Sequence, residues 1–132
     1  MKQNQRISLL REEILRISGV NPKKCMRCGK CTGTCPAYDE MDYHPHEVVD
    51  MVERGEIAPL LASESLVRCL SCMACSERCP RGVRPSALVE AVCTVRQRMS
   101  GEQTLSPDGI PARLDEDMPQ QLLVSALRKY RK

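Results

Sequence analysis

Two runs of evenly spaced cysteines contain the residues of this chain that are best suited to chemistry. Cysteines stand at positions 25, 28, 31 and 35, followed by Pro36, and the same spacing recurs at 69, 72, 75 and 79, followed by Pro80. This C-x2-C-x2-C-x3-C-P pattern binds four-iron clusters, and in two-cluster ferredoxins the fourth cysteine of each run ligates the other cluster. We therefore expect two [4Fe-4S] clusters, one held by Cys25, Cys28, Cys31 and Cys79 and the other by Cys69, Cys72, Cys75 and Cys35.

Other uses of these cysteines fit the pattern less well. A structural zinc site takes four tetrahedral ligands, commonly from two C-x-x-C pairs, so the third cysteine of each run would have no role. A disulfide framework belongs to oxidising compartments, and the first residues, Met1 to Gln5, form neither an apolar signal peptide nor a twin-arginine signal. A thioredoxin-like pair would need a βαβ pattern, which we do not find. The expected location is the cytoplasm.

Three further residues could be considered as ligands, but a structural role is expected for each. Cys93 follows Val89 by four residues on an expected helix, which favours a buried free thiol. His44 and His46 flank Pro45, where surface or helix-start positions are more common than metal ligation. We assign no catalytic residue.

The charge balance argues against nucleic-acid binding. The 132-residue chain has a formal net charge of +3, and two oxidised clusters at about −2 each, thiolates included, would bring it to about −1. Lysines and arginines crowd both cysteine runs, where they can offset the anionic clusters and tune their reduction potentials. The sequence contains no phenylalanine or tryptophan, so it lacks an aromatic platform for bases. Cluster binding should instead supply part of the folding free energy.

Hydrophobic spacing predicts helices throughout, and therefore an all-α fold. Helices are expected over residues 7–17, ended by Gly19, from Pro45 to Gly55, from a cap at Ser63 towards Cys69, and from Pro85 to Gly101. The longest apolar stretch, 57–62, is far too short to cross a bilayer, so direct membrane insertion is not expected.

Three segments are predicted along the chain. Residues 1–22 form an N-terminal amphipathic helical arm and residues 23–101 an α-helical ferredoxin domain. Residues 102–132 combine an irregular linker with a C-terminal amphipathic helix that begins at Pro119 and carries Leu122, Leu123, Ala126, Leu127 and Tyr130 on one face. This last helix could fold back on its own domain or dock on a partner.

The residues around both cysteine runs resemble the C subunit of heterodisulfide reductase and its bacterial relatives. The resemblance extends from about Cys25 to Met99, and it is carried by the run from Cys28 to Thr32, by Cys35-Pro36, and by the residues from Cys69 to Val83. It implies the α-helical ferredoxin fold, which is also found in the iron-sulfur subunits of succinate dehydrogenase and anaerobic glycerol-3-phosphate dehydrogenase.

The same resemblance implies a role in electron transfer. In that family the C subunit passes electrons between an A subunit with flavin and iron-sulfur centres and a B subunit whose cysteine-rich clusters cleave a disulfide. This chain has neither the paired-cysteine C-C-G motif of a B subunit nor a G-x-G-x-x-G loop. We therefore expect a non-catalytic iron-sulfur subunit. The alternatives are an iron-sulfur subunit of another dehydrogenase, of glycerol-3-phosphate or succinate type, a free two-cluster ferredoxin and, more remotely, a zinc-stabilised interaction module.

Overall fold

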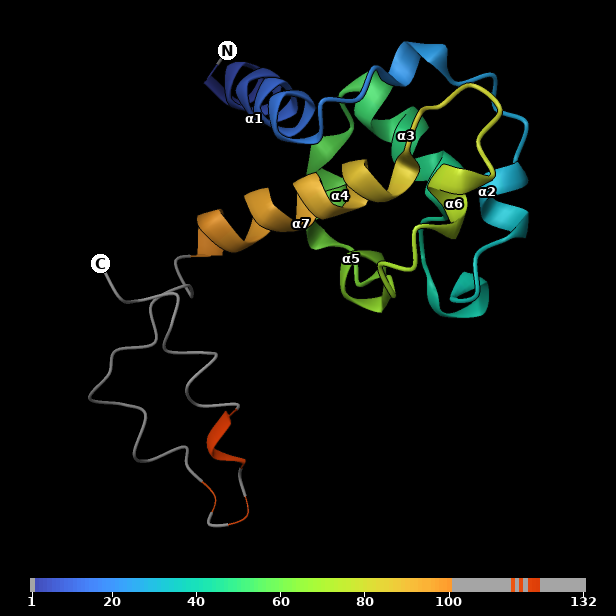
Figure 1. Cartoon of the computed structure of the whole chain (residues 1–132). Coiled ribbons are helices and arrows are strands. Elements are labelled where there is room, and N and C mark those ends of the chain that lie inside the picture. Colours follow the sequence, from blue (N-terminus) through green and yellow to red (C-terminus); the bar gives the residue numbers. More distant parts are fainter. Residues whose placement is uncertain (1, 101–114, 116, 118, 122–132) are drawn as a thin grey trace. The chain divides into compact units, whose positions relative to one another are not determined.

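The computed structural model describes residues 2–100, 115, 117 and 119–121, and the chain divides into two compact units, Met1–Gly101 and Glu102–Lys132. All regular elements among these described residues are helical, which confirms the all-α prediction for this part of the chain (Figure 1). The expected C-terminal amphipathic helix lies outside the described residues except at its start, where Gln120 and Gln121 are helical. The elements of the first unit are α1 (Lys2–Ser18), η1 (Pro22–Lys24), α2 (Lys30–Gly33), η2 (Tyr38–Glu40), α3 (Pro45–Arg54), α4 (Ile57–Ala62), α5 (Ser65–Arg68), α6 (Ala74–Glu77) and α7 (Pro85–Ser100).

The long helices begin and end where proline and glycine predict. Pro45 opens α3, because proline at the first helical position has no N–H to leave unsatisfied. Gly19 and Gly55 follow α1 and α3 with φ angles of 61° and 83°, the left-handed conformation that ends a helix. Ser63 lies one residue before the expected cap position, because Glu64 is the N-cap of α5, and the Ser63 Oγ accepts the N–H of Ser65 at 3.0 Å.

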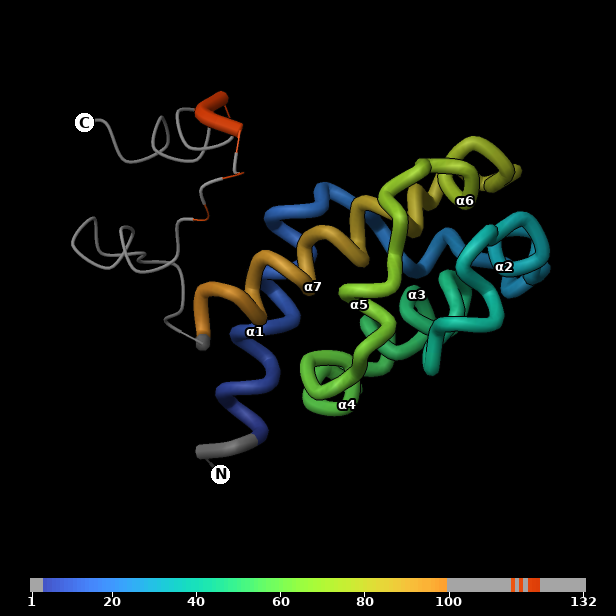
Figure 2. Tube along the Cα trace, turned by 90° about the horizontal axis from the view of Figure 1, so that it is seen from below, coloured from blue at the N-terminus to red at the C-terminus, as the bar shows by residue number. Residues whose placement is uncertain are grey.

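Aliphatic side chains from α1, α3, α4 and α7 form the core of the first unit. Helices α1 and α7 run side by side, and α7 also packs on α3 and α4 (Figure 2). The face predicted for α7 is confirmed at Leu88, Val92 and Val95, which are buried, whereas Met99 near the helix end is 46% exposed. None of the described helices combines the length and hydrophobicity needed to span a bilayer. The large side chains with the least exposure are Ile14, Val48, Val49, Val52, Ile57, Leu60, Val83, Leu88 and Val92.

The cysteine loops and the helices after them form a duplicated arrangement. Repeat 1 (residues 25–54) contains the first loop, α2 and α3, and repeat 2 (residues 69–100) contains the second loop, α6 and α7. Helix α2 packs on α3 just as α6 packs on α7, and the repeats meet through contacts of α2 with α6 and of α3 with α7 (Figure 1). Because the fourth cysteine of each motif follows α2 or α6, the pairing of these two short helices brings that cysteine to the other repeat.

Candidate iron-sulfur centres

The structure gathers the eight motif cysteines into two groups of four. Hollow 1 has an empty volume of about 350 Å³, and its cysteines are Cys25, Cys28, Cys31 and Cys79. Hollow 2 has an empty volume of about 390 Å³, and its cysteines are Cys69, Cys72, Cys75 and Cys35. Each hollow thus receives three cysteines from one motif and the fourth from the other motif.

Left-handed residues at matching positions curve both cysteine loops. In repeat 1 they are Arg27 and Gly29, with φ angles of 55° and 74°, and in repeat 2 they are Ser71 and Met73, with φ angles of 52° and 63°. A chain that alternates in this way bends tightly within a few residues, so the loop can present successive cysteines to one side. The bend also directs the N–H of Arg27 to the Sγ of Cys25, at 3.4 Å.

Short helices place the fourth cysteine of each motif in the same way. The Gly29 carbonyl accepts the N–H groups of Thr32 and Gly33 in α2, at 3.1 and 3.0 Å, and the Met73 carbonyl does the same for α6. The N–H of Cys35 then bonds to the Thr32 carbonyl at 3.0 Å, and Cys79 makes the equivalent bond in repeat 2. The Cys79 Sγ also accepts the N–H of the buried Val83 at 3.3 Å.

Burial raises the pKa of three of the thiols. In Cys31, Cys69 and Cys75, desolvation is the largest cause and favours the neutral thiol, whereas hydrogen bonds from nearby residues lower the pKa. Nearby cysteines raise the pKa of Cys31 further, and one of them is Cys75 of the other hollow, so the two groups lie close together. Partly buried thiolates crowded in this way need cationic compensation, which bound iron would supply.

The arrangement fits a multi-iron cluster. Among the residues that the structure describes, no three side chains of His, Cys, Asp or Glu converge on a position for a single metal ion. The four thiols of each group instead surround a volume, and a cubane cluster, with iron at four of its corners, takes one thiolate at each iron. The donor set, the left-handed loops and the cross-over of the fourth cysteine therefore fit [4Fe-4S] binding in both hollows.

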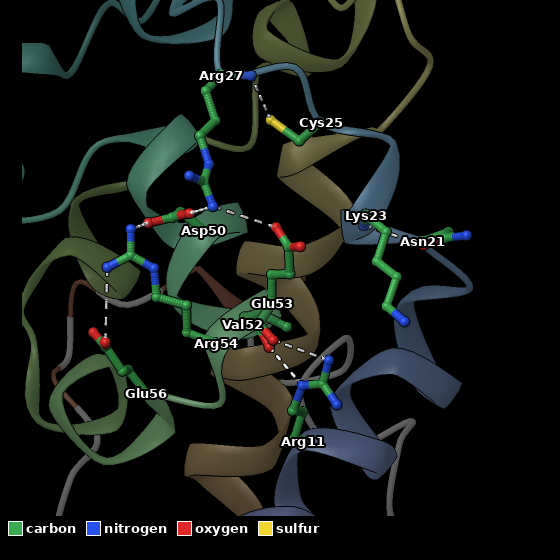
Figure 3. Close-up of polar contacts among 10 residues, drawn as sticks. All are labelled: Arg11, Asn21, Lys23, Cys25, Arg27, Asp50, Val52, Glu53, Arg54 and Glu56. Carbon is green, nitrogen blue, oxygen red and sulfur yellow. Dashed lines mark hydrogen bonds and ion pairs between the residues drawn. The ribbon is translucent and has the colours of Figure 1, made fainter.

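An ion-pair network fixes the first loop to α3. The Arg27 guanidinium lies 2.5 Å from Asp50 and 3.8 Å from Glu53, and Arg54 holds the other carboxylate oxygen of Asp50 at 2.6 Å (Figure 3). Arg11 of α1 donates to the carbonyl groups at the end of the same helix (Figure 3). The second loop has Ser71 at the position of Arg27, so it lacks this anchor.

The other cysteine and the two histidines have separate places. Cys93 lines neither hollow, is only half-buried, and accepts a weak hydrogen bond from Gln97 at 3.7 Å. His44 bonds to Glu47 at 2.7 Å and stacks on Tyr38. His46 is a helix-start residue, as expected, but its side chain also lines hollow 1. Its contribution to the site was missed from the sequence, although the duplication could have indicated it, since His46 and Ser86 both follow the proline that opens a helix.

Apolar side chains are exposed at the rims of both hollows. Met26 lines hollow 1 and is 57% exposed, while Leu70 and Met73 line hollow 2 and are 67% and 53% exposed. Exposed apolar groups at the rim of a site are common at surfaces that contact another protein.

Comparisons with known proteins agree with the geometry. Residues 21–83 match the family model of the 4Fe-4S dicluster domain. The chain is 34% identical over 85 residues to the iron-sulfur C subunit of the CoB–CoM heterodisulfide reductase of Methanopyrus kandleri, covering 64% of this chain and 40% of the relative. It is 28% identical over 96 residues to the C subunit of the ferredoxin/F420H2-dependent CoB–CoM heterodisulfide reductase of Methanosarcina acetivorans, covering 73% and 57%.

A relative from another kind of enzyme also matches. The glycolate oxidase iron-sulfur subunit of Escherichia coli is 30% identical over 135 residues, which cover 98% of this chain and 28% of the relative. The chain therefore spans between 28% and 57% of the length of these three relatives. The shared part is the region of the two cysteine motifs, and C subunits of heterodisulfide reductases recur among the matches. The chain belongs to the family of 4Fe-4S dicluster proteins that includes these iron-sulfur C subunits.

Proposed function

We propose that this chain is the iron-sulfur electron-transfer subunit of a cytoplasmic, heterodisulfide-reductase-like complex. The observation that carries the proposal is the pair of four-cysteine hollows, each completed by a cysteine from the other motif. Such a unit can hold two redox centres in one packed fold, and we assign it no catalytic group. Thiolates that remain free to ligate iron also favour a reducing compartment, as the cytoplasm is.

The two ligand sets follow from the hollows. We assign one [4Fe-4S] cluster to Cys25, Cys28, Cys31 and Cys79, and the second to Cys69, Cys72, Cys75 and Cys35. When bound, each cluster supplies one-electron redox chemistry. The protein itself supplies the thiolates, the N–H donors to Sγ atoms such as those of Arg27 and Val83, and a packed contact between α2 and α6 that keeps the two centres near each other.

The partners that this proposal implies are a flavin and iron-sulfur A subunit and a cysteine-rich B subunit. Support comes from the relatives that are C subunits and from the exposed side chains at the rims, Met26 beside hollow 1 and Leu70 with Met73 beside hollow 2. A partner covering either rim would bury apolar surface and exclude water next to a centre. We propose that the segment 102–132 adds a helical arm for the same assembly and that residues 1–22 act as the N-terminal arm.

A second candidate is an iron-sulfur subunit of a flavin dehydrogenase. The observation that favours it is the E. coli glycolate oxidase subunit, whose match covers 98% of this chain. Both candidates use the same two centres, and they differ in the protein that docks at each rim.

Anaerobic purification of the tagged full chain from its native host tests the proposal. We expect about eight irons per chain, the absorbance of [4Fe-4S] clusters, and co-purification of a flavin subunit together with a cysteine-rich subunit. Co-purification of a flavin dehydrogenase without the cysteine-rich subunit would favour the second candidate. Zinc in place of iron would refute both.

A further inference from the structure

The duplication places different side chains at one equivalent position beside the two hollows. Helix α3 begins with Pro45-His46 and α7 begins with Pro85-Ser86. His46 lines hollow 1 and Ser86 lines hollow 2. The two centres therefore share a backbone setting but differ by an imidazole against a hydroxyl.

Both side chains bond to the hydroxyl that follows the third cysteine of their motif. The Nδ1 atom of His46 lies 2.6 Å from the Oγ1 of Thr32, which is 9% exposed. In repeat 2 the Oγ atoms of Ser86 and Ser76 are 2.5 Å apart. The pairs His46–Thr32 and Ser86–Ser76 thus occupy the same place in the two repeats, each one step away from a cysteine of the hollow.

The hydrogen bonds around Thr32 can be directed from their donors and acceptors. The Thr32 Oγ1 accepts the backbone N–H of His46 at 3.3 Å, and the hydroxyl has one hydrogen to donate. Burial raises the pKa of Cys31, while hydrogen bonds from the side chain and backbone of Thr32 lower it, so Thr32 is a donor to this sulfur. An anionic thiolate attracts the hydroxyl hydrogen more strongly than a neutral ring nitrogen does. His46 must then supply the hydrogen of the 2.6 Å contact from its Nδ1.

We propose that His46 donates to Thr32, that Thr32 donates to the Sγ of Cys31, and that this relay sets the reduction potential of the centre in hollow 1 apart from that in hollow 2. The inference rests on the proposed binding of clusters in both hollows. Hydrogen bonds to ligand sulfurs are among the main determinants of cluster potentials. Because reduction adds negative charge, a donor aimed at the sulfur stabilises the reduced state and raises the potential. His46 acts through Thr32, so it is a positioning residue.

The test measures the midpoint potential of each centre by paramagnetic resonance during redox titration of the full chain, loaded with iron and sulfide anaerobically. In His46→Leu we expect a negative shift confined to one centre. His46→Asn should return that potential close to the wild-type value, because its amide N–H can donate to the Thr32 hydroxyl. Ser86→Ala is the matched control, and it should shift only the other centre.

A double-mutant cycle separates the relay from a packing effect. Thr32→Val should reproduce the shift of His46→Leu, and the double variant should shift the potential no further than the larger single change, since both remove one chain of hydrogen bonds. Unchanged potentials in His46→Leu at full iron content would overturn the inference, as would equal shifts of both centres. If His46→Leu loses a cluster, the comparison of Thr32→Val with His46→Asn decides. A wild-type chain that binds no iron would refute the proposed function itself, which the iron assay reports separately.

Discussion

The loop from Cys25 to Cys35 and the loop from Cys69 to Cys79 follow one backbone path with different side chains. Left-handed residues stand at the same two positions, but the second of them is Gly29 in repeat 1 and Met73 in repeat 2. The first loop also has the Arg27–Asp50 ion pair to α3, which the second lacks at Ser71. The duplication thus fixes the ligand geometry, while local stability and electrostatics are set separately at each centre.

This difference suggests why two similar centres would suit one electron path. Repeat 1 offers a cationic loop that is tied to the core helix α3, with Arg27 and the nearby Lys23, Lys24 and Lys30 around it. Repeat 2 offers a more apolar rim, where Val67, Leu70 and Met73 are each more than half exposed. Unequal surroundings give unequal potentials and different contact surfaces, and both favour a preferred direction of transfer between partners.

The largest expected effect comes from breaking the exchange of cysteines between the loops. If the ligand sets are crossed as proposed, Cys79→Ala should disrupt the centre of the first motif, and Cys35→Ala should disrupt that of the second. Each variant should lose about four of about eight irons, and its whole first unit should become less stable, because a cluster bound only in the folded state adds to the folding free energy.

Anaerobic crystallography or cluster-resolved paramagnetic resonance of the two variants would provide the assignment. Two clusters that each take all four cysteines from a single motif would contradict it. Cys28→Ala serves as a control, since it should damage the centre of its own motif under either arrangement.

A smaller effect should separate the loops at their second left-handed residue. Left-handed backbone costs a residue with a Cβ about 1–2 kcal/mol, so Gly29→Met should destabilise the first unit by about that amount, even though no atom lies within 4 Å of the added Cβ position. Met73→Gly should relieve the same cost but add backbone entropy to the unfolded chain, for a net change within about 1 kcal/mol.

The rate of cluster loss during anaerobic guanidinium unfolding measures both changes. We expect about 5–30 times faster loss in Gly29→Met, which is the factor that corresponds to 1–2 kcal/mol. Equal and large losses in both swaps would mean that Met73 is held by contacts of its own and that the loops do not differ in backbone strain.

The ion pair of the first loop should matter less. Arg27 is 55% exposed and Asp50 18% exposed, so solvent screens the pair and Arg27→Ala should cost about 0.2–1 kcal/mol. The difference from the wild type should shrink at high salt. Ser71→Ala, at the matching position of repeat 2, is the control and should show no salt-dependent difference. A salt-independent loss in Arg27→Ala would assign the effect to packing of the arginine stem.

The sequence predicted the helices and the cysteine pattern because their signals are local. Prolines and glycines placed the ends of α3, and spacing alone named the eight cysteines as candidate ligands. The sequence could not show the role of His46, because its contact with Thr32 joins residues fourteen positions apart through the packing of α2 on α3. The Arg27–Asp50 pair escaped prediction for the same reason, since any of several nearby acidic residues could have met that arginine.

The smallest effect is expected at Cys93, the cysteine that belongs to neither loop. It lies on α7 outside both hollows, with the Gln97 amide 3.7 Å from its Sγ, so Cys93→Ser should leave the iron content and the cluster spectrum unchanged. The half-buried position makes the change in the free energy of unfolding small as well, because a hydroxyl there can still reach water. Iron analysis and paramagnetic resonance of the variant, beside wild type prepared in parallel, provide the measurement. Loss of one centre would make Cys93 a ligand, and one of the eight motif cysteines would then have to be released from the proposed sets.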